Sequence, residues 1–152
     1  MGWQILSANY KRSMLRKITE KDLTFARRLR NKNRNYFFDS RKVDELTHHA
    51  WFTASQLDPD FHFYIIWEKE DRVGTISAHD NGEVIEIGNV LIDENHRKKG
   101  YCRKAIRELL ELHRRRALLL SIHLSTQERP CWRPNFTDVE LLRLTSILST
   151  RK

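Results

Sequence analysis

Three strand patterns in quick succession constrain the fold of this chain more than any other feature of its sequence. Residues 61–67 are rich in aromatic and β-branched residues, residues 73–79 form a second short strand pattern, and residues 84–92 are mostly apolar. Residues 80–83, between the last two patterns, contain an Asn-Gly pair, which favours the type I′ turn of a hairpin. The sequence therefore predicts an antiparallel sheet whose third strand is covered on both faces.

Further elements are predicted on both sides of these strands. In chain order they are a strand at residues 14–18, a helix that begins after Thr19 and stops near Asn31, a helix at residues 43–55, a helix that begins near Tyr101, and a strand at residues 118–124. The order strand, loop, helix, strand at the end indicates a parallel crossover unit. Together the patterns predict an α/β (α+β) fold, in which helices flank a mixed, mainly antiparallel sheet in a single domain.

Length and composition bound the domain organisation. A chain of 152 residues corresponds to one domain, since domains span about 100–200 residues, and 39% apolar residues suffice for one core. We expect a loose leader at residues 1–13, the folded domain at 14–124, and an atypical C-terminal segment at 125–152 packed on the same domain. The sequence contains no run of about 18 apolar residues, so no membrane span is predicted. Two cysteines without a CxxC pair and no secretory signal favour a reducing cytoplasm, and no metal site is expected.

The clearest chemical signal lies between the third strand and the helix that follows it. Lys and Arg exceed Asp and Glu by 28 to 20, so the chain carries a net charge of +8 and attracts anions. Arg97, Lys98, Lys99 and Gly100 lie just before the helix, and Arg103 lies in its first turn. Unpaired amides and the dipole at a helix start, together with a glycine that lets a ligand approach, predict a phosphate site. The alternative is a solvated basic loop before an ordinary helix.

The residues of this loop resemble a known family. Arg97-Lys98-Lys99-Gly100-Tyr101-Cys102 is similar to the R/Q-x-x-G-x-G/A signature of the GNAT family of N-acetyltransferases, and residues 86–93 resemble that family's fourth strand. The predicted order of elements over residues 14–124 also matches. The resemblance implies acetyl-CoA as co-substrate and direct acetyl transfer to an amine in a ternary complex. It implies that Val90, Leu91 and Ile92 offer backbone groups to the pantetheine arm, and that residues 97–103 bind the diphosphate.

Candidate catalytic and acceptor residues follow from this resemblance. An amine arrives largely protonated and must lose a proton before it attacks a thioester. Glu86, in the strand beside the implied thioester, is the favoured base, and His79 on the neighbouring strand is the second candidate. The upstream part resembles family members that act on amino-sugar nucleotides, as in pseudaminic-acid synthesis. The acceptor pocket implied by this likeness comprises Arg30, Asn31, His49 and Trp51. An Arg and a stacking aromatic suit a nucleotide, whereas Trp51 in the core is the structural alternative.

Departures from the family pattern leave other functions open. Cys102 occupies a position where the family usually has Gly or Ala, and no tyrosine follows Tyr101 to reprotonate the leaving thiolate. A catalytically weak CoA-binding or regulatory module is therefore one alternative. A basic nucleic-acid-binding domain is the other, although no recognition motif accompanies the basic run at residues 114–116. The expected partner is a small-molecule or nucleotide-sugar amine acceptor and not a membrane, and pairing of two copies through the apolar C-terminal segment is left open.

Overall fold

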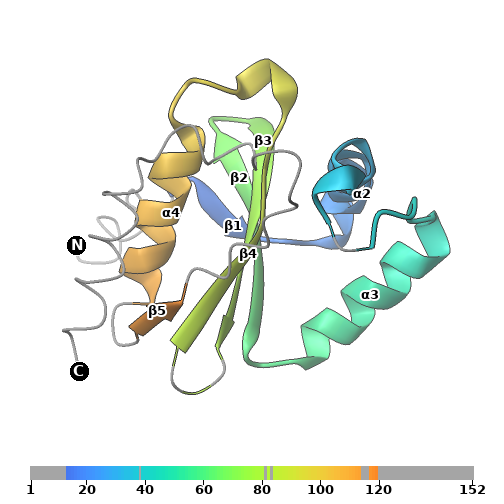
Figure 1. Ribbon diagram of the computed structural model, residues 1–152, viewed down its shortest axis with the longest axis horizontal. Coiled ribbons are helices and arrows are strands. Elements are labelled where there is room, and N and C mark those ends of the chain that lie inside the picture. The colour runs from blue at the N-terminus through green and yellow to red at the C-terminus, as the bar shows by residue number, and fades with distance from the viewer. Residues whose placement is uncertain (1–12, 38, 81, 83, 114–116, 120–152) are drawn as a thin grey trace, which may run out of the picture.

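The sheet predicted from the strand patterns is the centre of the fold. The computed structural model describes residues 13–37, 39–80, 82, 84–113 and 117–119. Its five strands lie in the order β1-β2-β3-β4-β5. They are β1 (Leu15–Lys17), β2 (Phe61–Glu68), β3 (Asp71–Asp80), β4 (Val84–Ile92) and β5 (Ala117–Leu119). The first four pair antiparallel and β5 pairs parallel with β4, which confirms the mixed, mainly antiparallel sheet (Figure 1).

Helices cover the two faces of this sheet. Helices α2 (Leu23–Lys32) and α3 (Glu45–Leu57) lie against one face, and α4 (Tyr101–Leu112) lies against the other (Figure 1). Short 3-10 turns occupy Glu20–Asp22 (η1), Arg34–Tyr36 (η2) and Glu94–His96 (η3). The predicted helices are therefore confirmed: the first begins after Thr19 as the turn η1 and continues as α2, and the ends of α3 lie two residues later than predicted. Among the described helices, none is both long and apolar enough to cross a bilayer.

Carboxylates fix where the first two helices begin. The backbone N–H and hydroxyl of Thr19 donate to Asp22 Oδ2 at 2.8 and 3.0 Å and form a capping box at the predicted helix start, three residues being the spacing that this motif requires. Asp44 caps α3, since its Oδ1 accepts from the backbone N–H of Thr47 at 2.7 Å. Buried Asp22 also accepts from Arg72 Nε at 2.8 Å, and this bond joins the start of α2 to β3.

Alternation along the strands builds an apolar core on each face of the sheet. The core under α4 includes Ile76, Ala78, Ile85, Ile87, Cys102, Ala105, Ile106 and Leu109. The core under α2 and α3 includes Ile18, Ala26, Phe52, Phe63 and Ile65. The expectation that both faces of β4 are covered is met by this arrangement. On α4 the helical spacing of apolar residues makes one covered stripe, in which Cys102, Ala105, Ile106 and Leu109 are buried and Leu110 is partly buried.

The final strand supports the predicted crossover. Residues 117–119 form β5, which runs parallel to β4 with Val84 opposite Ala117. Strand β4, helix α4 and strand β5 therefore make one parallel unit, as the order of patterns indicated. Residues 120–124 of the predicted strand, most of the leader and the segment 125–152 lie outside the described residues. The domain boundaries stay predictions.

Gly74 gives a test of how closely β3 and β4 approach. A Cβ at this position would lie 2.3 Å from the carbonyl oxygen of Leu91 and 2.9 Å from Ile92 Cδ1. We expect Gly74→Ala to lower the free energy of unfolding by roughly 1–3 kcal/mol, because a backbone oxygen must move. The matched control is Gly88→Ala, whose Cβ would meet only Ser77 Oγ at 3.4 Å. Urea unfolding that shows equal losses for both variants would contradict this packing.

Candidate active site

A bulge in β4 redirects the second half of that strand. Thr75 pairs with Leu91 and Ser77 with Gly88, so β4 contains one more residue than β3 between these pairs. Asn89 in this interval has a φ of 52°. Two hydrogen bonds hold it, because Thr75 Oγ1 donates to the Asn89 carbonyl at 2.8 Å and Asn89 Nδ2 donates to Ser77 Oγ at 2.8 Å. A bulge of this kind bends a strand and commonly lies next to active sites.

The loop after β4 presents the start of α4 in an open arrangement. Gly100 is the N-cap of α4 with a φ of 85°, and a Cβ there would meet no atom of the described residues within 4 Å. Lys98 has a φ of 63°, and the side chains of Lys98 and Lys99 are exposed. A helix start preceded by a glycine and exposed cations binds phosphate groups through its amides and its dipole. These residues fit a diphosphate.

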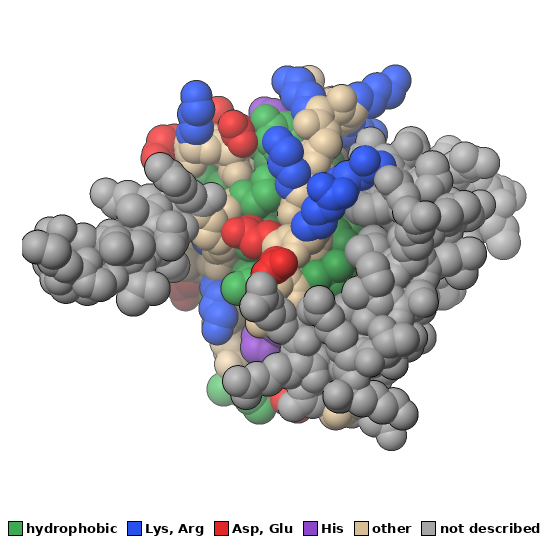
Figure 2. Space-filling model, turned by 90° about the vertical axis from the view of Figure 1, so that its left-hand side faces the viewer, with side chains coloured by type: hydrophobic (Ala, Val, Ile, Leu, Met, Phe, Trp, Pro, Cys, Tyr) green, Lys and Arg blue, Asp and Glu red, His purple; other side chains and the backbone are tan. Residues whose placement is uncertain are grey.

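The basic surface continues along α4. Figure 2 shows the face formed by this helix, on which Lys and Arg side chains gather toward the upper end. Lys104 and Arg107 on α4 are exposed and lie three positions apart, so both occupy one side of the helix. These positive side chains lie beyond the residues that sequence reasoning assigned to the predicted anion site.

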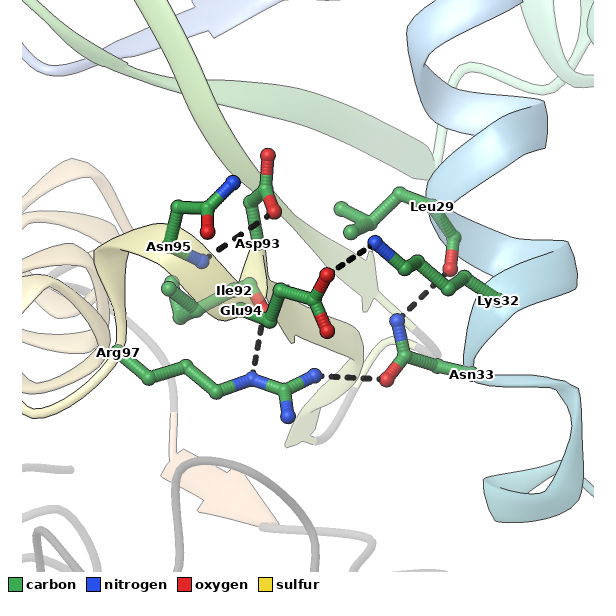
Figure 3. A network of polar contacts seen from close by, with 8 residues as sticks. All are labelled: Leu29, Lys32, Asn33, Ile92, Asp93, Glu94, Asn95 and Arg97. Atoms are coloured by element: carbon green, nitrogen blue, oxygen red, sulfur yellow. Dashed lines mark hydrogen bonds and ion pairs between the residues drawn. The ribbon is translucent and has the colours of Figure 1, made fainter.

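Two signature side chains point inward instead. Arg97 Nε donates to the carbonyl of Ile92 at 3.0 Å, and Arg97 Nη2 donates to Asn33 Oδ1 at 2.8 Å (Figure 3). Cys102 is 1% exposed and packs in the core under α4, so the thiol fills space where the family usually has Gly or Ala. Tyr101 packs against the same core, and its ring lies 6.2 Å from that of His96. The assignments of residues 90–92 and 97–103 to CoA stay predictions.

A cavity of about 330 Å³ lies between α2, α3 and the sheet. Its walls are formed by Ala26, Arg30, Phe37, Val43, Thr47, His48, Trp51, Phe63, Thr75, Asn89 and Leu91. Two of the predicted acceptor residues, Arg30 and Trp51, therefore line the same space as Asn89 of the β4 bulge. No carboxylate is among the described residues of this wall.

The other two predicted acceptor residues do not line this cavity. Asn31 exchanges two hydrogen bonds with the backbone of Val43, at 2.9 and 2.8 Å, and so fixes the chain before α3. His49 is exposed, with Nε2 3.9 Å from Glu20 Oε1. Its neighbour His48 lines the cavity. The spacing could have revealed this, because His48 lies three and four positions before Trp51 and Phe52, on the covered face of the helix.

His48 and Arg30 give the cavity its polar character. The His48 ring is 7% exposed and stacks on Trp51, with ring centroids 5.0 Å apart. Burial lowers the pKa of His48, and the positive charges of Arg27 and Arg30 lower it further, so the imidazole is neutral at pH 7. The Arg30 guanidinium lies over the Phe37 ring at 4.6 Å and donates to the Asp39 carbonyl at 2.7 Å.

The two candidate bases lie opposite each other on β3 and β4. His79 and Glu86 are register partners in the sheet. Because Ile85 and Ile87 belong to the core under α4, Glu86 lies on the opposite face, which α2 and α3 cover. Glu86 is partly buried there. The His79 ring lies 6.1 Å from that of Phe61, and its Nε2 lies 3.6 Å from Asp58 Oδ2. Both residues stay candidates.

Comparison with known proteins identifies the family. The model of the acetyltransferase (GNAT) family matches residues 25–131, more than half of the chain. The chain belongs to this family. It is therefore classed among the acetyl-CoA-dependent N-acetyltransferases. Curated proteins give no match to the sequence. Among the described residues, no group of three or more His, Cys, Asp or Glu side chains is placed to hold a metal ion.

Solved structures share this GNAT fold. Ribosomal-protein-alanine N-acetyltransferase from Brucella melitensis is 22% identical with a TM-score of 0.58, over 67% of this chain and 67% of its own. Spermidine N-acetyltransferase from Vibrio cholerae, in complex with CoA and spermine, is 20% identical with a TM-score of 0.56, over 64% and 60%. FdhC, a nucleotide-linked sugar GNAT, is 22% identical with a TM-score of 0.51, over 64% and 59%. At sequence identities of 20–22%, these comparisons show a shared fold alone.

Proposed function

We propose that this GNAT protein transfers the acetyl group of acetyl-CoA directly to a primary amine in a ternary complex. The observation that carries the proposal is the open start of α4, where Gly100 has a positive φ and follows a bulged strand and a basic loop. The family match supports the same activity. We place the reaction in the cytoplasm, on the grounds of cysteine usage in the sequence.

The chain's own residues supply each part of a CoA site in this proposal. The backbone amides at the start of α4, from Gly100 to Arg103, donate hydrogen bonds to the diphosphate oxygens, and Lys98 and Lys99 add positive charge from exposed positions. By their place in the family motif, Val90, Leu91 and Ile92 offer backbone groups to the pantetheine arm. The bulge at Asn89 sets the direction of these three residues relative to the cavity.

We propose an amino-sugar nucleotide as the acceptor. The cavity offers the Trp51 and His48 rings for stacking and the Arg30 cation for an anionic group. Its described walls contain no carboxylate, which a polyamine would need as a counter-charge. A structural neighbour of the same fold is a nucleotide-linked sugar GNAT. These observations favour a neutral or anionic acceptor over a polycationic one.

Removal of a proton from the amine is the step for which the chain itself must supply a base. Acetyl-CoA supplies the acetyl group as an activated thioester. In the proposed reaction Glu86 takes one proton from the protonated amine through a short chain of waters, because Asn89 at the cavity wall lies roughly 10 Å further along the strand at about 3.3 Å per residue. The amine nitrogen then forms the new bond to the acetyl carbon as the carbon–sulfur bond breaks. A thiol with a pKa of about 8.5 leaves as thiolate without a dedicated acid, and the second proton that the nitrogen loses passes through solvent to this thiolate, which gives the amide and free CoA thiol.

A thermal-shift titration followed by a thiol-release screen tests this proposal. We expect acetyl-CoA to raise the melting temperature, because a ligand that binds only the folded state stabilises it. Amino-sugar nucleotides should then release free thiol, whereas spermidine and short peptides should release little. Binding without thiol release from any amine would favour a regulatory CoA-binding module. No shift with acetyl-CoA, together with steeply salt-dependent binding to random DNA, would favour a nucleic-acid-binding domain.

A further inference from the structure

The signature residue Arg97 is committed to contacts inside the protein. Its guanidinium bridges the last residue of β4, through the Ile92 carbonyl, and the end of α2, through Asn33 Oδ1 (Figure 3). Asn33 is 5% exposed, and its amide is used on both sides, because Nδ2 donates to the Leu29 carbonyl at 2.8 Å. Asn33, which lies 64 positions before Arg97 in the sequence, thus holds this first residue of the family signature in place.

The backbone that follows Arg97 needs such an anchor. Lys98 and Gly100 both have positive φ values, and for Lys98 this conformation is unfavourable relative to the right-handed region. Non-glycine residues stay in the left-handed region only where their surroundings over-determine them. The bonds from Arg97 to Ile92 and Asn33 lie immediately before this residue and restrict the chain that leads into the helix start.

A second link between the same elements is of a different kind. Lys32 and Glu94 form an ion pair, with side chains that are 51% and 54% exposed (Figure 3). Exposed pairs of this type are screened by solvent and contribute little to stability. The bond between Asn33 and Arg97 is charge-assisted and half-buried, and Asn33 itself is only 5% exposed, so this bond is the stronger of the two restraints.

We infer that Asn33 is a positioning residue for the CoA loop, acting through Arg97. This inference rests on the proposed function, because it assigns the loop at residues 97–103 to CoA. Asn33 holds the guanidinium against the end of β4, and Arg97 in turn fixes Lys98 in the conformation that opens the start of α4. Arg97 then serves CoA by shaping the loop, whereas Lys98 and Lys99 supply the exposed charge. Since α2 also carries Arg30, one helix contacts both the loop and the acceptor cavity.

Binding of CoA to matched variants tests the inference. We expect Asn33→Ala to weaken CoA about tenfold in calorimetric titration, as the loss of a hydrogen bond to a charged group predicts. Lys32→Ala, which breaks only the exposed ion pair to Glu94, should stay within about twofold of wild type. The kcat at saturating acetyl-CoA should change less than the KM. Weakening by Lys32→Ala equal to that by Asn33→Ala would overturn the inference.

Two further measurements test the inference if Asn33→Ala folds poorly or if the protein does not bind CoA. Arg97→Lys keeps the positive charge but loses the two-partner fork, so it should also weaken CoA about tenfold, while unchanged affinity would overturn the inference. Amide exchange over residues 97–101 of the free protein should be faster in Asn33→Ala than in Lys32→Ala. Wild-type protein that fails to bind CoA refutes the proposed function, and equal exchange in the two variants separately refutes the anchoring of the loop.

Discussion

Replacing Gly100 with Val should weaken CoA binding by roughly 10²–10³-fold, a loss equivalent to two charge-assisted hydrogen bonds from the chain. A Cβ at Gly100 meets no atom within 4 Å in the part of the chain that the structure describes, so the added side chain enters the space before α4 in which we place the diphosphate. The branched side chain also disfavours the φ of 85°, so the backbone shifts and the amides at the helix start turn away from the proposed position of the diphosphate. Calorimetric titration with CoA measures the loss.

Gly82 provides the matched control for this prediction. It has a φ of 98°, and a Cβ there likewise meets no atom within 4 Å. Gly82→Val therefore imposes a similar backbone strain at the turn between β3 and β4, away from the start of α4. We expect it to lower the melting temperature about as much as Gly100→Val does, with CoA affinity within about twofold of wild type. Similar losses of affinity in both variants would show that strain, and not blocked access, is responsible.

Those elements that depend on local sequence were predictable. The hairpin around Gly82 follows from an Asn-Gly pair, and the capping box at Thr19 follows from the spacing to Asp22. Each requires only residues a few positions apart, so a single sequence contains the whole signal. The start of α4 at Tyr101 was predictable for the same reason, because Gly100 and the preceding basic loop interrupt the apolar pattern.

Features that depend on distant partners were not predictable. The inward position of Arg97 depends on Asn33, and nothing in the local sequence distinguishes this cation from Lys98. The bulge at Asn89 depends on Thr75 and Ser77 of the neighbouring strand, although the Gly-Asn pair within an apolar strand was a usable signal. Long-range pairing determines the shape of the site, whereas local pattern determines which elements carry it.

Replacing Glu86 with Gln should lower turnover by roughly 10²–10⁴-fold, the usual contribution of a positioned general base. Gln has nearly the same size and keeps one acceptor oxygen, but its NH2 replaces the other oxygen and it cannot take a proton at neutral pH. Because Glu86 lies on the face of β4 covered by α2 and α3, and not in the loop at residues 97–103, CoA affinity should stay within about twofold. Steady-state thiol release and calorimetric titration measure the two quantities.

His79 is the internal comparison for this variant, since it is the register partner of Glu86 and the second candidate base. We expect His79→Gln to retain most of the turnover, because the His79 ring lies beside Phe61 and Asp58 instead. A larger loss in His79→Gln than in Glu86→Gln would move the base to His79. The pH dependence gives a second readout: residual turnover of Glu86→Gln should rise tenfold per pH unit below the pKa of the amine, since only the neutral amine that solution supplies can react. A pH-independent residual rate would mean that deprotonation of the amine does not limit the reaction, and Glu86 would lose its role.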